Sequence, residues 1–297
     1  MEAMIKIMLD SASDQSASMR QTYDLETIPM QIMVGREEYI DDPNVKVETI
    51  HQFMREGKMP KTAQISPQVA EEAFEKQAKA GHDVIFISIF KGLSGSIQVA
   101  RKAMKAVEDR YPNFKEAVVD CRSASGAGTL IYLHGQALIE AGYDFDQIRD
   151  QLDQSAQDMA VYVAADDIEW LAKGGRVPKT IGKVGSMLQV KPLLTLDDEG
   201  FIKDSLVRCQ DRVYMKMADK LIDLISPYDG QYLLISHVGR REMAEKVRDY
   251  IMSKYGPVNI GIFEASPVIS CHIGLGGLGV FAYKTKPELF EPVTFNS

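Results

Sequence analysis

Apolar runs and amphipathic stretches alternate along the first half of the chain. The run 83–90 (DVIFISIF) is rich in β-branched residues and is typical of a strand buried on both faces. The stretch before it begins at Ser66–Pro67 and ends at Gly81, which are start and stop signals for a helix. The alternation continues, with strands expected at 5–10 and 115–120, a polar loop at 11–18, and helices at 47–57, 97–110, 127–142 and 145–159. We therefore predict an α/β domain with a mostly parallel open sheet covered by helices.

The second half has a different pattern. Strands at 190–196 and 201–208 flank the turn signal Asp-Asp-Glu-Gly and predict a β-hairpin. Further strands are expected at 160–165, 231–238, 258–265 and 279–285, and helices at 167–174, 180–188, 213–225 and 241–256. A hairpin beside long helices predicts a second α/β domain with antiparallel strands. We expect two domains, 1–159 and 160–297.

Composition and charge exclude several classes of function. The 297 residues carry a formal net charge of −8 and no cluster of Lys and Arg, so we expect no nucleic-acid partner. The three cysteines show no C-x-x-C spacing and are expected to be reduced thiols. Cys271 precedes His272, but neighbours on a strand point to opposite faces, which favours a buried, inert thiol. No signal peptide or membrane span is indicated, so a cytoplasmic location is expected.

The stretch HIGLGGLG contains Gly274, Gly276 and Gly279 at the spacing of a dinucleotide-binding turn. Such a turn must open a helix and be followed by a second strand carrying an acidic residue. Here only 18 of the 297 residues follow Gly279, and they alternate like a strand. NAD binding is therefore disfavoured. We expect a tight glycine turn between two strands, with His272 at its edge.

The segment KGLSGS follows the most apolar strand and opens a helix. Ser94, Gly95 and Ser96 are thus expected at a helix N-terminus, where free N–H groups and hydroxyls suit a small anion. Ordinary helix capping by Ser94 or Ser96 is the alternative. Thr62 precedes another helix in the same way. A serine hydrolase using Ser94 and His272 with an aspartate can also be drawn, although no G-x-S-x-G elbow surrounds Ser94.

The loop after the first strand carries carboxylates in the sequence LDSASD. Oxygen ligands of this kind can hold a hard cation. No recognisable calcium or phosphate motif and no histidine at ligand spacing accompanies them. Turn and cap roles are therefore favoured for Asp10, Ser11 and Asp14, and no metal site is predicted.

Several short motifs occur in a fixed order along the chain. After the strand ending in Asp-Ser come T-x-Q-x-S-P, L-S-G-S, K-G-G-R, a Lys-Pro pair that begins a strand, V-R, and H-x-G-x-G-x-x-G-V. Each motif alone is weak, but their order and spacing from Ile5 to about Tyr283 resemble the DegV family of bacterial fatty-acid-binding proteins.

The resemblance implies a function. It implies a long-chain fatty acid, such as palmitate, stearate or oleate, buried between two α/β domains. The protein would be the lipid-binding subunit of a bacterial fatty acid kinase serving phospholipid metabolism. It would present the acyl carboxylate to a separate ATP-binding kinase subunit, and would itself be no enzyme and need no other cofactor. Transient contact with a membrane is compatible with this role.

The resemblance also assigns residues. It matches Thr62, Ser94 and His272 to the family's carboxylate-binding residues, with Ser96 where the family usually has Thr. Gly95, Gly274 and Gly276 match the turns around them. Arg176 and Arg208 match arginines at the head-group end and the kinase-facing surface. The departures from the family pattern are Ala63, Ile97, Ile273 and Leu275. They leave the chain-length preference and the kinase pairing open.

Overall fold

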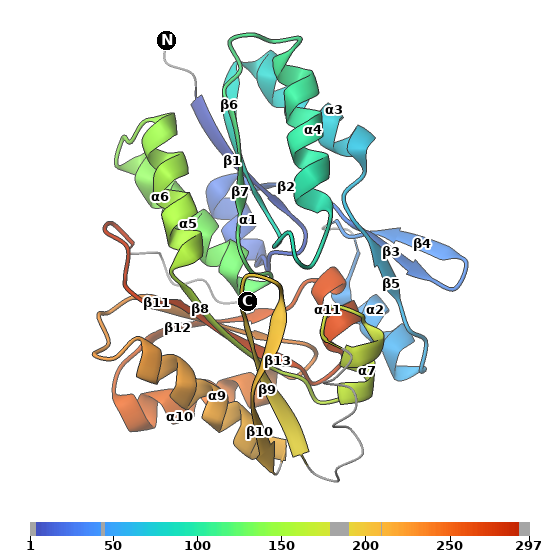
Figure 1. The fold of residues 1–297 in the computed structure, drawn as a ribbon, viewed down its shortest axis with the longest axis vertical. Coiled ribbons are helices and arrows are strands. Elements are labelled where there is room, and N and C mark those ends of the chain that lie inside the picture. Colours follow the sequence, from blue (N-terminus) through green and yellow to red (C-terminus); the bar gives the residue numbers. More distant parts are fainter. Residues whose placement is uncertain (1–3, 43–44, 179–189, 209, 291–297) are drawn as a thin grey trace.

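The computed structural model describes residues 4–42, 45–178, 190–208 and 210–290. Its first half contains a parallel sheet with the strand order β2-β1-β6-β7 (Figure 1). These strands are β1 (Met4–Asp10), β2 (Glu26–Ile28), β6 (His82–Ser88) and β7 (Glu116–Asp120). All of β6 after His82 is buried, which confirms the prediction of a strand covered on both faces.

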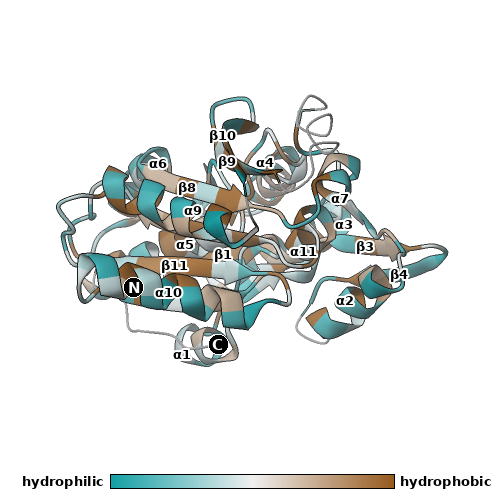
Figure 2. Ribbon diagram, turned by 90° about the horizontal axis from the view of Figure 1, so that it is seen from below, coloured by the Kyte–Doolittle hydropathy of each residue, from teal (hydrophilic) through white to brown (hydrophobic). Residues whose placement is uncertain are grey.

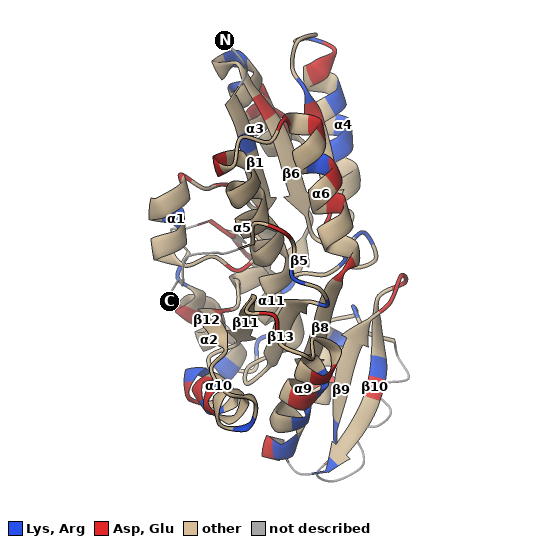
Figure 3. Cartoon of the chain, turned by 90° about the vertical axis from the view of Figure 1, so that its left-hand side faces the viewer, with Lys and Arg blue, Asp and Glu red and all other residues tan. Residues whose placement is uncertain are grey.

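Two pairs of helices cover this sheet. Helices α3 (Pro67–Ala80) and α4 (Ser96–Glu108) pack together on one side, and α5 (Gly126–Glu140) and α6 (Phe145–Gln157) on the other (Figure 1). Helix α3 has proline at its first position and ends at Gly81 with φ +77°, as predicted. Charged residues gather on outer helices such as α4, α6 and α10 (Arg241–Tyr255) (Figure 3).

The segment between β1 and α3 differs in part from the expectation. Helix α1 (Ala17–Tyr23) begins inside the predicted polar loop. Ser16 caps it by accepting the Met19 N–H at 3.1 Å. Within α1, whose residues are all described, only Met19 is buried, so no apolar periodicity marks the helix. A small antiparallel sheet, β4-β3-β5, and helix α2 (Val47–Arg55) follow; its strands are β3 (Gln31–Val34), β4 (Glu37–Ile40) and β5 (Lys61–Ala63).

The second half is built on a six-stranded sheet in the order β10-β9-β8-β13-β11-β12. Its strands are β8 (Met159–Ala164), β9 (Val190–Leu196), β10 (Phe201–Arg208), β11 (Tyr232–His237), β12 (Asn259–Glu264) and β13 (Leu278–Tyr283). The β11–β12 pair is parallel and the other pairs are antiparallel, which confirms the predicted hairpin and antiparallel strands. Helices α9 (Gln210–Leu224) and α10 cover one face, next to the apolar strands β8 and β11 (Figure 2).

Two short helices lie near the other face of the six-stranded sheet, beside the glycine-rich stretch. Helix α7 (Ile168–Lys173) confirms the predicted short helix, which Asp167 caps by accepting the Trp170 N–H at 3.0 Å. Helix α11 (Pro267–Ile273) corrects the expectation of a turn between two strands. His272 and Cys271 lie on this helix, and the glycines connect its C-terminus to β13. The helix expected at 180–188 lies outside the described residues.

Candidate functional site

A cavity lies between the six-stranded sheet and the N-terminal half of the chain. The space that its walls surround, including open solvent at the mouth, amounts to about 870 Å³. Its walls are mainly apolar side chains from both halves of the chain, among them Met30, Ile89, Leu93, Val161, Val163, Leu171, Val177, Phe201, Val238, Val268, Ile269 and Phe281. The polar lining residues fall into separate groups, and two of these groups determine which polar groups of a ligand the cavity can bind.

The first polar group brings together three of the predicted residues. Thr62 on β5, Ser94 before α4 and His272 on α11 all line the cavity. Thr62 Oγ1 lies 2.7 Å from His272 Nε2, although 210 positions separate the two residues. Arg176 also lines the cavity, and among the described lining residues it is the one Lys or Arg. These four side chains form a polar end of the cavity, which is the predicted head-group end.

The direction of the Thr62–His272 hydrogen bond follows from the surroundings of the imidazole. His272 Nδ1 lies 3.0 Å from the Gly174 carbonyl oxygen, which can only accept, so Nδ1 carries a proton. Burial, together with the charge of Arg176, lowers the pKa of His272 to about 4. The ring is therefore neutral at pH 7, and Nε2 accepts the Thr62 hydroxyl proton. His272 orients Thr62 without adding charge.

Ser94 is held by its neighbour in the same loop. Ser94 Oγ lies 3.0 Å from Ser96 Oγ and accepts the Ser96 N–H at 3.2 Å. Ser96 is fully buried, accepts the Ile65 N–H at 3.3 Å, and is outside the cavity lining. Ser96 therefore lies behind Ser94 and fixes its position. A Cβ at Gly95 would collide with the side-chain amide oxygen Oε1 of Gln64, so glycine here leaves room for that side chain.

The glycines after His272 allow close packing rather than nucleotide binding. Gly274 has φ +86°, and a Cβ there would meet Trp170 at 2.9 Å. Trp170 Nε1 donates to the Cys271 carbonyl at 3.0 Å, which ties α7 to α11. Gly276 has φ +81°, and a Cβ would meet Asp166 at 2.8 Å. A dinucleotide turn would begin a helix, whereas these glycines end one.

We expect Gly276→Ala to cost more stability than a glycine replacement in open space. Both Gly276 and Gly57 have positive φ, but nothing lies within 4 Å of a Cβ at Gly57. Gly57→Ala should cost about 1 kcal/mol of unfolding free energy from backbone strain, and Gly276→Ala roughly 2–3 kcal/mol because Asp166 must also move. Urea unfolding of the two variants measures the difference. Equal losses would contradict the packing role.

The two predicted arginines lie in different places. Arg176 donates to the Gly174 carbonyl at 3.1 Å, and its side chain is exposed beside the head-group end. Arg208 is exposed at the end of β10, whose first residue, Phe201, lines the cavity. Arg208 is seven positions along the strand from Phe201, roughly 23 Å at about 3.3 Å per position. The structure therefore brings Arg176, but not Arg208, to the head-group end.

The hydrolase arrangement of Ser94 and His272 is not formed. A serine nucleophile needs a hydrogen bond to its base. His272 instead bonds Thr62 and the Gly174 carbonyl, and Ser94 bonds Ser96. Cys271 is buried, and burial raises the pKa of its thiol, so it is an unreactive neighbour.

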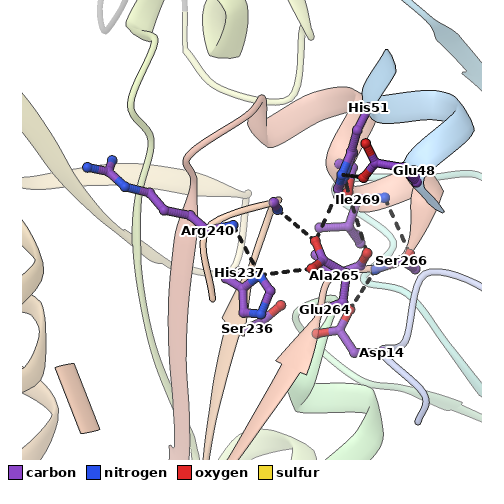
Figure 4. Close-up of polar contacts among 12 residues, drawn as sticks. Asp14, Glu48, His51, Ser236, His237, Arg240, Glu264, Ala265, Ser266 and Ile269 are labelled. Carbon is purple, nitrogen blue, oxygen red and sulfur yellow. Dashed lines mark hydrogen bonds and ion pairs between the residues drawn. The ribbon is translucent and has the colours of Figure 1, made fainter. Parts of the chain in front are cut away.

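A second polar network lies behind α11 (Figure 4). His51 Nε2 on α2 lies 3.1 Å from Ser270 Oγ. His237 Nδ1 lies 3.0 Å from Glu264 Oε2, and Glu264 Oε1 accepts the Gly239 N–H at 2.7 Å. The trio of Ser270, His51 and Glu264 resembles a catalytic triad in composition. Ser270 is fully buried and outside the cavity lining, so this network joins α2, α11 and β12 structurally.

The carboxylates after β1 have structural partners. Asp10 accepts from Ala12 N–H at 3.2 Å, as the predicted turn role requires, and from Ile89 N–H at 2.8 Å. Asp14 Oδ1 accepts the Ser266 N–H, in the second half of the chain, at 3.0 Å. Among the described residues, no three His, Cys, Asp or Glu side chains come together as a metal site. No described helix has the length and apolar character needed to cross a bilayer.

Sequence reasoning missed several polar lining residues. Gln64, Ser123, Ser125 and Ser236 all face the cavity. Ser236 lies within a buried strand, where alternation gives no signal, and Gln64 was visible only as part of T-x-Q. Ser125 has φ +60°, a conformation that its sequence does not announce.

The fold and this cavity define an α/β protein with two main sheets and a largely apolar site for a small ligand. The chain belongs to the DegV family, because the family model described as "Uncharacterised protein, DegV family" matches residues 4–285. It is 30% identical over 287 residues to the DegV domain-containing protein YteA of Lactococcus lactis, covering 95% of this chain and 98% of that protein.

Solved structures share the fold. A DegV family protein from Ruminococcus gnavus, refined with vaccenic acid, has a TM-score of 0.84 at 22% identity and covers 94% of this chain and 99% of its own. The Streptococcus pneumoniae Fatty Acid Kinase (Fak) B3 protein, loaded with linoleic acid, has a TM-score of 0.84 at 21% identity, with coverage of 94% and 99%. These likenesses confirm the predicted fold class.

Proposed function

We propose that this protein binds a long-chain fatty acid in the cavity and presents its carboxylate to a separate kinase subunit. The carrying observation is the cavity itself, which combines long apolar walls with one polar end formed by Thr62, Ser94, His272 and Arg176. Its two domains would be 1–159 and 160–297, with the ligand between them. The expected setting is the cytoplasm.

The chemistry of the cavity supports an amphiphilic ligand. Transferring an acyl chain from water gains about 0.8 kcal/mol per methylene, or roughly 10 kcal/mol for a common fatty acid. An ionised carboxylate loses its hydration and needs hydrogen bonds in return. Ser94 at the start of α4 provides one hydroxyl, the Thr62 hydroxyl would turn its hydrogen from His272 Nε2 to the carboxylate when the ligand binds, and Arg176 provides the positive charge.

The partner would be an ATP-binding fatty acid kinase subunit that converts the carboxylate to an acyl-phosphate. The order of sequence motifs and the likeness to the Streptococcus pneumoniae B3 protein support this role. The exposed Arg176 at the head-group end is placed to meet an incoming phosphate or an acidic partner surface. Arg208, exposed on β10, would belong to the same docking surface. The carrier would supply no catalytic residue.

The binding role is tested by native mass spectrometry of freshly purified protein. We expect a retained mass corresponding to one common fatty acid, such as palmitate, stearate or oleate. Delipidated protein should take up added oleate at a ratio of one to one. Protein that retains no lipid and takes up neither palmitate nor oleate would contradict the proposal. The kinase role is tested separately, by adding a fatty acid kinase subunit and ATP and measuring acyl-phosphate.

A further inference from the structure

A second polar group lines the cavity away from the head-group end. It consists of Ser125, which precedes α5, and Ser236 on β11, and it is named here the inner polar site. Behind them lies Asp14, which is fully buried. Ser125 donates to an Asp14 oxygen and lies 3.1 Å from Ser236 Oγ, and Ser236 also hydrogen-bonds the Asp14 carboxyl. The site therefore joins the two halves of the chain at the cavity wall.

The hydrogen bonds decide what the inner polar site can recognise. Because the Ser125 hydroxyl directs its hydrogen to Asp14 and the Ser236 hydroxyl bonds within the same cluster, oxygen lone pairs are left to accept from a ligand. An apolar chain beside them leaves no donor unsatisfied, so a plain fatty acid is tolerated. A ligand hydroxyl, which would be costly to bury against an apolar wall, finds an acceptor here.

The backbone holds Ser125 in an uncommon conformation. Its φ of +60° and ψ of −129° lie outside the regions that side chains favour. Two hydrogen bonds fix it, from Ser125 N–H to the Ala12 carbonyl at 2.7 Å and from Asp14 N–H to the Ser125 carbonyl at 3.4 Å. These backbone hydrogen bonds fix the conformation of Ser125 and so set the position of its hydroxyl at the cavity wall.

Helix α11 gives the spacing between the two polar groups. Asp14 accepts the Ser266 N–H at 3.0 Å just before the helix, and His272 lies in its last turn (Figure 4 shows the Asp14–Ser266 contact). Val268, Ile269, His272 and Ile273 line the cavity, so it follows one face of α11 along its length. His272 is six positions after Ser266, and a helical rise of about 1.5 Å per position puts the two roughly 9 Å apart along the helix axis.

This spacing corresponds to the middle of an acyl chain. A zigzag chain of C–C bonds of about 1.5 Å advances roughly 1.25 Å per carbon. Roughly 9 Å is about seven carbons beyond C1, so a carboxylate at Thr62 and Ser94 places the carbons from about C8 onward beside the inner polar site.

We propose that the inner polar site recognises a hydroxyl near the middle of the acyl chain, so that mid-chain hydroxy fatty acids belong to the ligands of this protein. The inference rests on the proposed fatty-acid binding and names a ligand class within it. It predicts that the position of the hydroxyl, and not its presence alone, controls affinity.

The test compares stearate, 10-hydroxystearate and 15-hydroxystearate on delipidated full-length protein, by competition with a fluorescent fatty acid. Wild-type protein should bind 10-hydroxystearate within about threefold of stearate, and 15-hydroxystearate at least tenfold more weakly. Ser236→Ala should weaken 10-hydroxystearate about tenfold more than it weakens stearate. Ser123→Ala is the matched control, because Ser123 lines the cavity without a bond to Asp14, and should change neither ligand.

The outcomes separate the two proposals. If stearate binds but 10-hydroxystearate is as weak as the 15-isomer, the inference is overturned while fatty-acid binding stands. If Ser236→Ala weakens both ligands equally, Ser236 is only structural and the inference again fails. Protein that binds none of the three overturns the proposed function and the inference together. The comparison of isomers on wild-type protein decides the matter even if Ser236→Ala does not fold.

Discussion

Replacing both head-group hydroxyls, in the variant Thr62→Val with Ser94→Ala, should weaken fatty-acid binding by roughly 2–4 kcal/mol, taking about 1–2 kcal/mol for each hydrogen bond to a charged group. This corresponds to a loss in affinity of roughly 30- to 700-fold. The effect should be large because the carboxylate then enters a cavity whose remaining head-group cation, Arg176, lies exposed near its mouth. The apolar walls are untouched, so part of the affinity should remain.

The measurement is titration of delipidated protein with oleate by isothermal calorimetry. The conservative variant Thr62→Ser with Ser94→Thr keeps both hydroxyls and is the matched control. It should bind within about threefold of wild type. Circular dichroism should show that both variants are folded, since neither Thr62 nor Ser94 is fully buried. Unchanged affinity in the first variant would place the head group elsewhere in the cavity.

Local signals in the sequence identify much of the fold. The buried run that becomes β6 and the signals Ser66–Pro67 and Gly81 around α3 each act over a few residues, so they can be recognised without tertiary information. Helix α11 has comparable signals, Ser266–Pro267 at its start and Gly274 after its end, but no helix was predicted there. Its segment is rich in β-branched residues such as Val268 and Ile269, which favour a strand.

Distant contacts explain why α11 forms nevertheless. Ser266 caps it locally, but Asp14 and Asp41 accept backbone N–H groups at its start, from more than 200 positions away in sequence. The candidate site, likewise, can be predicted from local sequence only in part. The hydroxyls of Thr62 and Ser94 are visible in sequence, whereas the direction of the Thr62–His272 bond depends on the Gly174 carbonyl, which no motif reveals.

Asp41 provides the second large expected effect, a change in stability with pH. Its carboxyl accepts the Val268 N–H at 3.3 Å and bonds Ser11. Burial raises its pKa from 3.8 to about 7, despite these hydrogen bonds and the nearby Arg20. Between these two values the native state binds more protons than the unfolded state. The contribution of Asp41 to the unfolding free energy therefore falls as the pH rises from about 4 to about 7.

The variant Asp41→Asn isolates this effect because an amide does not titrate. Relative to wild type, we expect the variant to gain up to about 4 kcal/mol of unfolding free energy between pH 4 and pH 8, at about 1.4 kcal/mol per pKa unit. The difference between the two proteins is the useful quantity. His272 and His134, whose pKa values burial lowers to about 4, give wild type an opposing slope over part of the same range.

Urea unfolding of both proteins at intervals of half a pH unit measures this difference. The control is Asp24→Asn, at an exposed carboxylate whose hydrogen bond from Lys6 lowers its pKa. The contribution of that carboxylate is fully present above its unfolded pKa of about 4 and is lost only at lower pH, so the difference between Asp24→Asn and wild type should be nearly flat from pH 4 to pH 8. Any change should also be small because solvent screens the pair. A flat difference for Asp41→Asn would mean that Asp41 is ionised in the native state throughout, and that its bond to α11 persists at acid pH.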